Sequence, residues 1–151
     1  MTAAAKQATD VMAVADRLRP TVLQLARELR RERIAGVSSQ QVGLLVSIKY
    51  TPGVTVGELA AEERVSTAAM SKRVSRLERD GLVTRTPSET DRRQVGLTLS
   101  DEGQRVLRRV RSRRTAWLAS RLDTLSPDEL ARVGAAVDAL SHLLAGEKSG
   151  A

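Results

Sequence analysis

The sequence predicts a mainly α-helical fold of the α+β class, in which two short strands lie among helices. Apolar residues recur at helical spacing over most of the 151 residues, and Gly, Pro and N-capping residues separate these stretches. Phe is absent, and the chain has one Tyr and one Trp. A core of Leu, Val and Ala favours packed helices, because all-β folds depend more on aromatic residues.

The N-terminal segment has a heptad-like apolar seam, which predicts one long helix. Its members are four or three residues apart: Val11, Ala15, Leu18, Val22, Leu25 and Leu29. Pro20 removes one backbone donor and disfavours helical geometry at Arg19. We therefore expect either a kink at this point or a helix that begins near Arg19.

Three further helices are predicted by their start signals between residues 36 and 80. Gly36 ends the first segment, and Ser38 followed by Gln41 predicts a capping box for a second helix that reaches Tyr50. A stop at Thr51-Pro52-Gly53 follows. A second capping box, Thr55-Val56-Gly57-Glu58, opens a short helix that ends near Arg64, and Ser66 is the expected N-cap of the next, Thr67 to Asp80.

The helix from Thr67 to Asp80 has two different faces. Met70, Val74 and Leu77 lie on one face, which we assign to the core. The other face combines basic with small residues: Lys72, Arg73, Arg76, Thr67, Ala68 and Ala69.

After Gly81, the segments Leu82–Arg85 and Val95–Leu99 alternate as two short strands, with a charged hairpin tip between them. Helix, tight turn, helix and hairpin together predict a winged helix-turn-helix. The small N-terminus of the second helix could approach base edges in the major groove, and its basic face could reach bases and phosphates. The hairpin tip could reach the adjacent minor groove. Double-stranded DNA is therefore the predicted partner.

Two more helices are predicted in the C-terminal third. Ser100 caps the first, which has Gly103 in its first turn and ends near Leu122; its apolar positions are Val106, Leu107, Val110, Trp117, Leu118 and Leu122. Ser126-Pro127-Asp128-Glu129 begins the second. That helix repeats apolar residues at Leu130, Val133, Val137, Leu140 and Leu144.

The net charge of +7 indicates an acidic partner. Residues 51–100 nevertheless carry 8 basic and 7 acidic side chains, so the argument from charge depends on individual helix faces. Residues 105–114 hold six Arg. These could form a stripe that contacts phosphates, or a solvated face whose aliphatic stems cover apolar neighbours.

Several functional classes find no support in the sequence. Cys is absent, which excludes disulfides, thiol chemistry and cysteine-ligated metal. His142 is the one histidine, so neither a zinc site nor a histidine-based triad is expected. No nucleophile–base pair or glycine-rich phosphate loop appears, and we predict no enzyme, metal or cofactor. Without a secretory signal or an apolar run of roughly 20 residues, we expect a cytoplasmic protein and no membrane partner.

Over nearly its whole length the chain resembles the MarR (multiple-antibiotic-resistance regulator) family of bacterial transcription factors. The densest match is Val65–Val74 followed by Leu77–Val83. The most specific part is Asp91-Arg92-Arg93, Leu97-Thr98-Leu99-Ser100 and Gly103, which is similar to the wing-and-strand signature of the family. The resemblance implies a winged helix-turn-helix with long N- and C-terminal dimerisation helices.

The helix-turn-helix and its resemblance to the family together give the predicted DNA-binding residues: Ser66, Thr67, Ala68, Ala69, Ser71, Lys72, Arg73, Arg76, Asp91, Arg92 and Arg93. By resemblance, the wing arginine falls on Arg93, and the acid that holds it falls on Asp91. An Arg in a narrow minor groove responds to its concentrated negative potential. From the residues alone, Arg92 and Arg93 could instead solvate the hairpin and pair with Glu89 or Asp91.

The predicted organisation is a helical dimerisation region, residues 1–50 and 101–151, around a DNA-binding region at 51–100. The family forms its dimer interface from the terminal helices of both chains. From the seams alone, the terminal helices could pair with a second copy or pack on each other in a monomer. A homodimer is favoured because reading a palindrome needs two recognition helices about 34 Å apart.

The predicted function is a transcriptional regulator, a repressor that binds a pseudo-palindromic operator as a homodimer. Resemblance adds release by a small aromatic or anionic effector, for which Arg17, Tyr50 and Trp117 are candidate pocket residues. Tyr50 and Trp117 fit packing roles as well, and His142 fits the dimer interface or the surface. The alternative function is a ligand-independent architectural DNA-binding protein.

Overall fold

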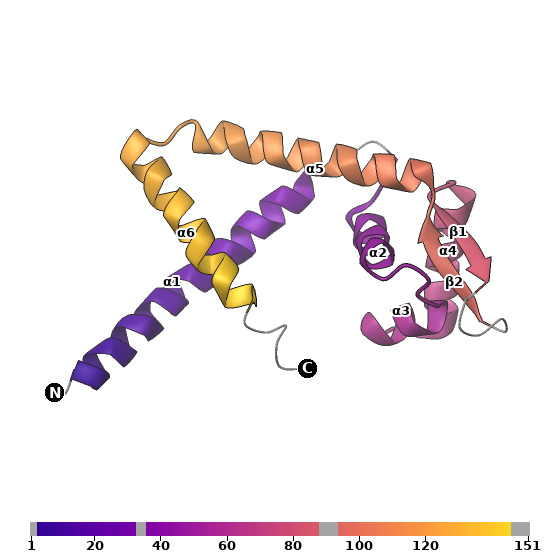
Figure 1. Ribbon diagram of the computed structural model, residues 1–151, viewed down its shortest axis with the longest axis horizontal. Coiled ribbons are helices and arrows are strands. Elements are labelled where there is room, and N and C mark those ends of the chain that lie inside the picture. The colour runs from indigo at the N-terminus through magenta and orange to yellow at the C-terminus, as the bar shows by residue number, and fades with distance from the viewer. Residues whose placement is uncertain (1–2, 33–35, 88–93, 146–151) are drawn as a thin grey trace. The chain divides into compact units, whose positions relative to one another are not determined.

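The computed structural model describes residues 3–32, 36–87 and 94–145, with side chains from residue 10 onward. Within these ranges the chain forms helices and a two-stranded antiparallel sheet (Figure 1). The elements are α1 (Ala3–Arg31), α2 (Ser39–Tyr50), α3 (Val56–Glu62), α4 (Thr67–Arg79), β1 (Val83–Pro87), β2 (Val95–Leu99), α5 (Asp101–Leu122) and α6 (Pro127–Ala145). The predicted mainly helical winged fold is confirmed.

Pro20 does not divide the first helix. Helix α1 is continuous from Ala3 to Arg31, so the expectation that a helix begins near Arg19 is wrong. A proline removes only the one hydrogen bond that its own N–H would make, to the carbonyl four residues earlier. Next to this position, the Thr21 hydroxyl donates to the Arg17 carbonyl at 2.9 Å. The turns on both sides keep their hydrogen bonds and carry the helix through.

The chain divides into two compact units, residues 1–114 and 115–151. The first unit holds the hydrophobic core, which lies among α2, α3, α4, the hairpin and the first half of α5 (Figure 1). Its most deeply buried side chains are Leu45, Ile48, Leu59, Met70, Val74, Leu77 and Leu97. Because α2 and α5 supply core residues, the helix-turn-helix depends on segments outside 51–100. The functional division at 51 and 100 remains a prediction.

The predicted helix starts are confirmed in atomic detail. The Ser38 hydroxyl accepts from the Gln41 N–H at 3.2 Å, and the Gln41 side chain accepts from the Ser38 N–H at 2.8 Å. Thr55 and Glu58 form the same reciprocal pair at the start of α3. The Thr55 N–H, with the Thr55 hydroxyl, lowers the pKa of Glu58. These local bonds fix where α2 and α3 begin.

The hairpin pairs Val83 with Leu99 at its base and Pro87 with Val95 at its far end. Strand β1 therefore continues two residues beyond the predicted end at Arg85. The middle of β2 is tied to the turn before α3, because the Gly53 N–H donates to the Leu97 carbonyl and the Leu97 N–H donates to the Val54 carbonyl, each at 2.9 Å. This bridge places the hairpin beside α3 and α4.

Four residues form a junction where α4, both strands and α5 meet: Gly81, Leu82, Ser100 and Gly103. The Ser100 hydroxyl donates to the Gly81 carbonyl at 2.6 Å and accepts from the Gly103 N–H at 3.0 Å. The Ser100 N–H donates to the Leu82 carbonyl at 3.1 Å. A Cβ atom at Gly103 would overlap that same carbonyl oxygen. Only glycine therefore fits this position of α5.

The second unit contains the end of α5 and the whole of α6. The Ser126 N–H donates to the Glu129 carboxylate at 2.9 Å, and the Ser126 hydroxyl does so at 2.7 Å, which confirms the predicted start of α6. These bonds, led by that from the hydroxyl, lower the pKa of Glu129. None of the described residues of α6 is buried. In the described ranges, no helix has the length and apolar character that crossing a membrane requires.

Replacing Gly103 with Ala should destabilise the fold. The added methyl group meets a backbone carbonyl that is held by Ser100, so the junction must shift, at a cost of about 1–3 kcal/mol in the free energy of unfolding. Gly43→Ala in α2 is the matched control, because nothing lies within 4 Å of its Cβ position. That change should stabilise by up to about 1 kcal/mol. Urea denaturation checks both, and equal stability of the two variants would contradict the role of the junction.

Candidate nucleic-acid interface

Helices α3 and α4 are joined by a tight four-residue turn. The Val65 N–H donates to the Ala60 carbonyl at 3.0 Å, and Arg64 adopts a left-handed conformation with φ of 53°. The Ser66 hydroxyl accepts from the Ala69 N–H at 3.1 Å and so caps α4. Val65 packs against the core from inside the turn. This arrangement is a helix-turn-helix in which α4 is the second, recognition helix.

Helix α4 separates its core face from a basic face. Met70, Val74 and Leu77 are fully buried. Of the residues predicted to bind DNA, those exposed to solvent are Ser66, Thr67, Ala68, Lys72 and Arg76, and those partly buried are Ala69, Ser71 and Arg73. The structure thus places the α4 candidates on the side of the helix away from the core, with the smallest side chains at its N-terminus.

The basic side chains of α4 are available to bind an anion. No carboxylate in the part of the chain that the structure describes pairs with Lys72, Arg73 or Arg76. The positive end of the helix dipole lies at the same N-terminus as the small residues. A polyanion that approached α4 would meet unpaired cations without first displacing a described acid.

A different arginine connects α4 to the hairpin. Arg85 of β1 donates from Nε to Oε1 of Glu78 at 2.8 Å and from Nη2 to Oε2 at 3.1 Å. These hydrogen bonds from the guanidinium to the carboxylate raise the pKa of Arg85. This pair was not among the predicted functional residues. The sequence pattern that points to it is the position of Arg85 two residues after the core residue Val83 on a strand, which puts both side chains on the same face.

The predicted wing residues Asp91, Arg92 and Arg93, together with Glu89, lie outside the described residues. The strands that lead to them are described up to Pro87 on one side and from Gln94 on the other. The assignments at the hairpin tip therefore stay predictions.

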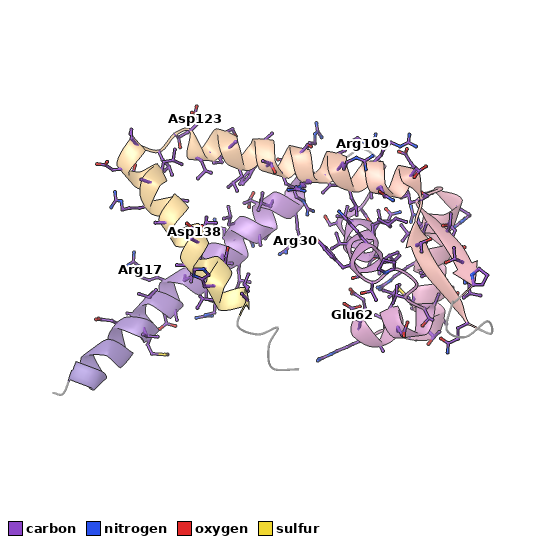
Figure 2. All side chains as sticks on the ribbon, viewed as in Figure 1. Arg17, Arg30, Glu62, Arg109, Asp123 and Asp138 are labelled. Atoms are coloured by element: carbon purple, nitrogen blue, oxygen red, sulfur yellow. The ribbon has the colours of Figure 1, made fainter. Side chains whose placement is uncertain are left out.

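The arginine-rich segment 105–114 is partly neutralised by an acid on the same helix. Glu102 pairs with Arg109 at 2.6 Å and with Arg105 at 3.4 Å. These residues, with Arg108 and Ser112, line a shallow depression of about 410 Å³ on α5. Figure 2 shows Arg109 on the side of α5 away from α2 and α3. Both the phosphate-contacting and the solvated interpretation of the segment remain open.

The three candidate effector residues lie on different elements. Arg17 lines a depression of about 340 Å³ that belongs to α1 alone, with Val14, Leu18 and Thr21 (Figure 2). Tyr50 ends α2 and is 78% exposed in the single chain, so it takes no part in the core of its own chain. The stop at 51–53 follows directly, and the buried residues of α2 end at Ile48. Trp117 is partly buried in the second unit, with its ring centroid 5.2 Å from the Arg121 guanidinium carbon.

No group of three or more His, Asp or Glu side chains among the described residues could hold a metal ion. The described surface offers unpaired basic groups beside small side chains on a helix that can enter a groove. These are the features of a nucleic-acid interface.

Comparison with known proteins identifies the family. A model of the MarR family matches residues 35–94. The HTH-type transcriptional regulator Mb0904 of Mycobacterium bovis is 34% identical over 124 residues, which cover 82% of this chain and 87% of that protein. The transcriptional regulator Tm0710 from Thermotoga maritima superposes with a TM-score of 0.77 at 26% identity, over 93% of this chain and 99% of that one.

A further structure, Streptococcus pneumoniae FabT in complex with DNA, superposes with a TM-score of 0.54 at 25% identity and covers 93% of this chain and 98% of that chain. The extensive match to Mb0904, the family model and the shared fold agree with the helix-turn-helix and the basic face of α4. The chain belongs to the MarR family of transcriptional regulators, which bind DNA through this winged helix-turn-helix.

Proposed function

We propose that this regulator is a homodimeric repressor that binds a pseudo-palindromic operator and is released by a small aromatic or anionic molecule. The observation that carries the operator-binding part is the solvent face of α4. Small side chains at its N-terminus stand next to Lys72 and Arg76, which have no described acidic partner. This combination allows a close approach to base edges and supplies donors for bases and phosphates.

The dimensions of α4 suit the major groove of DNA. Its 13 residues correspond to a length of about 20 Å. Thr67 and Ala68 lie at the end that would approach the bases, and Lys72 and Arg76 follow Ala68 along the same side of the helix. The hairpin beside α4 would then carry Arg93 toward the adjacent minor groove, where groove width and negative potential provide the information.

The terminal helices support a homodimer. Large apolar side chains of both helices are more than two-fifths exposed in the single chain: Val11, Val14, Val22, Leu23 and Leu25 on α1, and Leu130, Val137, Leu143 and Leu144 on α6. Contiguous exposed apolar residues of this kind mark interaction surfaces. A second copy would offer the same helices in a self-complementary interface and would supply the second recognition helix.

Repression and release are the regulatory part of the proposal. A dimer bound across two half-sites blocks access to promoter DNA, and repression is the usual outcome in the family that this chain resembles. The bacterial chromosome is the target, so we place the protein in the cytoplasm. Arg17, with the apolar side chains of Val14 and Leu18 beside it, could hold the carboxylate and ring of an aromatic acid.

On the promoter region of its own gene, the protein should protect a pseudo-palindrome whose half-site centres are about 10 bp apart. Footprinting at rising salt measures this, because non-specific binding is electrostatic and weakens steeply with salt. Protection that spreads along the DNA without a defined boundary would instead support the architectural alternative.

The same footprint repeated with benzoate tests release. Benzoate should weaken protection by the wild-type protein and leave Arg17→Ala unaffected, since that variant lacks the proposed carboxylate partner. A footprint that benzoate and related aromatic acids leave unchanged would remove Arg17 and this effector class from the proposal.

Val137→Asp should produce a folded monomer. Val137 is exposed in the single chain, so one chain tolerates a carboxylate there, whereas a dimer would bury it in an apolar interface. Ala135→Asp places the same charge on the opposite side of α6 and should leave the dimer intact. Sedimentation at micromolar concentration distinguishes one chain of 16.4 kDa from two. A dimer that persists in Val137→Asp would show that this face lies outside the interface.

Arg93→Ala should weaken operator binding by roughly 1–3 kcal/mol, with the largest effect on operators that have A·T-rich flanks, because a minor-groove contact is lost. Arg76→Ala should either relax base preference within each half-site or, if it contacts phosphate, weaken all sequences alike and reduce the salt slope by about one. Titrations at two salt concentrations on specific and scrambled duplexes separate these outcomes. Unchanged specific affinity of Arg93→Ala would exclude this minor-groove contact.

A further inference from the structure

The contact between Glu78 and Arg85 has no part in the DNA contacts proposed above. Glu78 lies in the last turn of α4, and Arg85 is the third residue of β1. Both guanidinium-to-carboxylate hydrogen bonds, 2.8 and 3.1 Å long, join the same two side chains. The side chains are 29% and 38% exposed, so they stand at the edge of the core. A paired contact of this kind resists rotation as well as separation.

The sequence between the two residues accounts for their meeting. Asp80 ends α4, and Gly81 turns the chain back with φ of 71°. Val83 then enters the core, and the alternation of the strand directs Arg85 to the same side. Glu78 follows the buried Leu77 and stands at the border of the core face of α4. The turn therefore brings the carboxylate opposite the guanidinium.

Two contacts hold the middle of the hairpin, one on each side. A two-stranded hairpin is marginally stable by itself, so its direction depends on what it contacts. The bridge between Val54 and Leu97 holds β2 at the level of Arg85, because Leu97 pairs with Arg85. Toward α3, an open depression of about 350 Å³ lies between Thr55, Val56 and Gly57 on one side and Arg85, Gln94 and Val95 on the other. The contact with Glu78 is the described ion pair that restrains the hairpin on the α4 side.

We propose that Glu78 and Arg85 are positioning residues, which fix the angle of the hairpin relative to the recognition helix and so determine operator selectivity. Arg93 precedes Val95 by two residues, so the direction of the hairpin sets the direction from which Arg93 approaches DNA. The pair would couple the major-groove contacts of α4 to the minor-groove contact of the wing. This inference rests on the proposed operator binding by helix and wing.

A direct contact of Arg85 with phosphate is the competing explanation, and it predicts different effects of substitutions at Arg85 and Glu78 on DNA binding. If Arg85 neutralised a phosphate, its loss would weaken every sequence alike. Loss of Glu78 would then free the guanidinium and strengthen binding. If the pair positions the wing, loss of either member should have the same effect, and that effect should fall on the preference for flanking sequence.

The test compares binding to two operator duplexes that differ only in A·T-rich or G·C-rich flanks. Glu78→Gln and Arg85→Gln should each reduce the ratio of the two affinities about fivefold, the lower end of the range for one specific contact. The double variant should match the single ones, and the exchange Glu78→Arg with Arg85→Glu should restore the ratio. Partial unfolding lowers both affinities equally and leaves the ratio unchanged.

Two control variants distinguish the positioning role of Glu78 and Arg85 from the minor-groove contact of Arg93. Glu62→Gln removes an exposed acid of α3 outside the pair and should keep the wild-type ratio (Figure 2). Arg93→Ala should abolish the flank preference; if it does not, the proposed minor-groove function fails. If Arg93→Ala abolishes the preference while Glu78→Gln and Arg85→Gln keep it, the positioning role alone is overturned. Equal weakening of both duplexes by Arg85→Gln, together with stronger binding by Glu78→Gln, would overturn it in favour of a phosphate contact.

Discussion

The close approach of α5 to the Leu82 carbonyl is the constraint on which the winged-helix region depends. Ser100 bonds to the backbone of Gly81, Leu82 and Gly103, so one residue fixes the end of the recognition helix, the base of the hairpin and the start of α5. Val106, Leu107 and Val110 then enter the core from α5. Without a glycine at position 103, this face of α5 could not reach the core at the same angle. A backbone constraint therefore determines the orientation of α4.

The distribution of acids explains how a nearly neutral region can bind DNA. Glu58 bonds to Thr55, Asp80 accepts from Gln41 at 3.2 Å, and Glu78 holds Arg85. These acids act within the fold, at helix ends and between elements. Lys72, Arg73 and Arg76 are left without a described acidic partner on the solvent face of α4. Net charge over 51–100 therefore underestimates the positive potential at the recognition helix.

Local chemistry made most of the fold predictable. The capping boxes at Ser38 and Thr55 and the faces of α4 depend on residues three or four apart, and the structure confirms them. Contacts between side chains on opposite sides of a turn could not be predicted from such local spacing, because nothing in the local pattern selects Glu78 as the partner of Arg85. The exposure of Tyr50 also depends on distant contacts, because the chain turns before its ring can reach the core. The expected helix start near Arg19 was wrong because the turns around Pro20 outweigh one missing hydrogen bond.

The same distinction between local and distant contacts bears on selectivity. Helix α4 can form from its own cap and periodicity, but the direction of a short hairpin depends on contacts with other elements. Strand β2 is fixed by backbone bonds between Leu97 and the residues Gly53 and Val54, and the α4 side of the hairpin is fixed by the Arg85 side chain. The contacts of Leu97 use backbone atoms, which substitutions change little, whereas the contact of Arg85 can be altered by one substitution. A change at Glu78 or Arg85 could thus shift operator preference while the residues that contact bases stay the same.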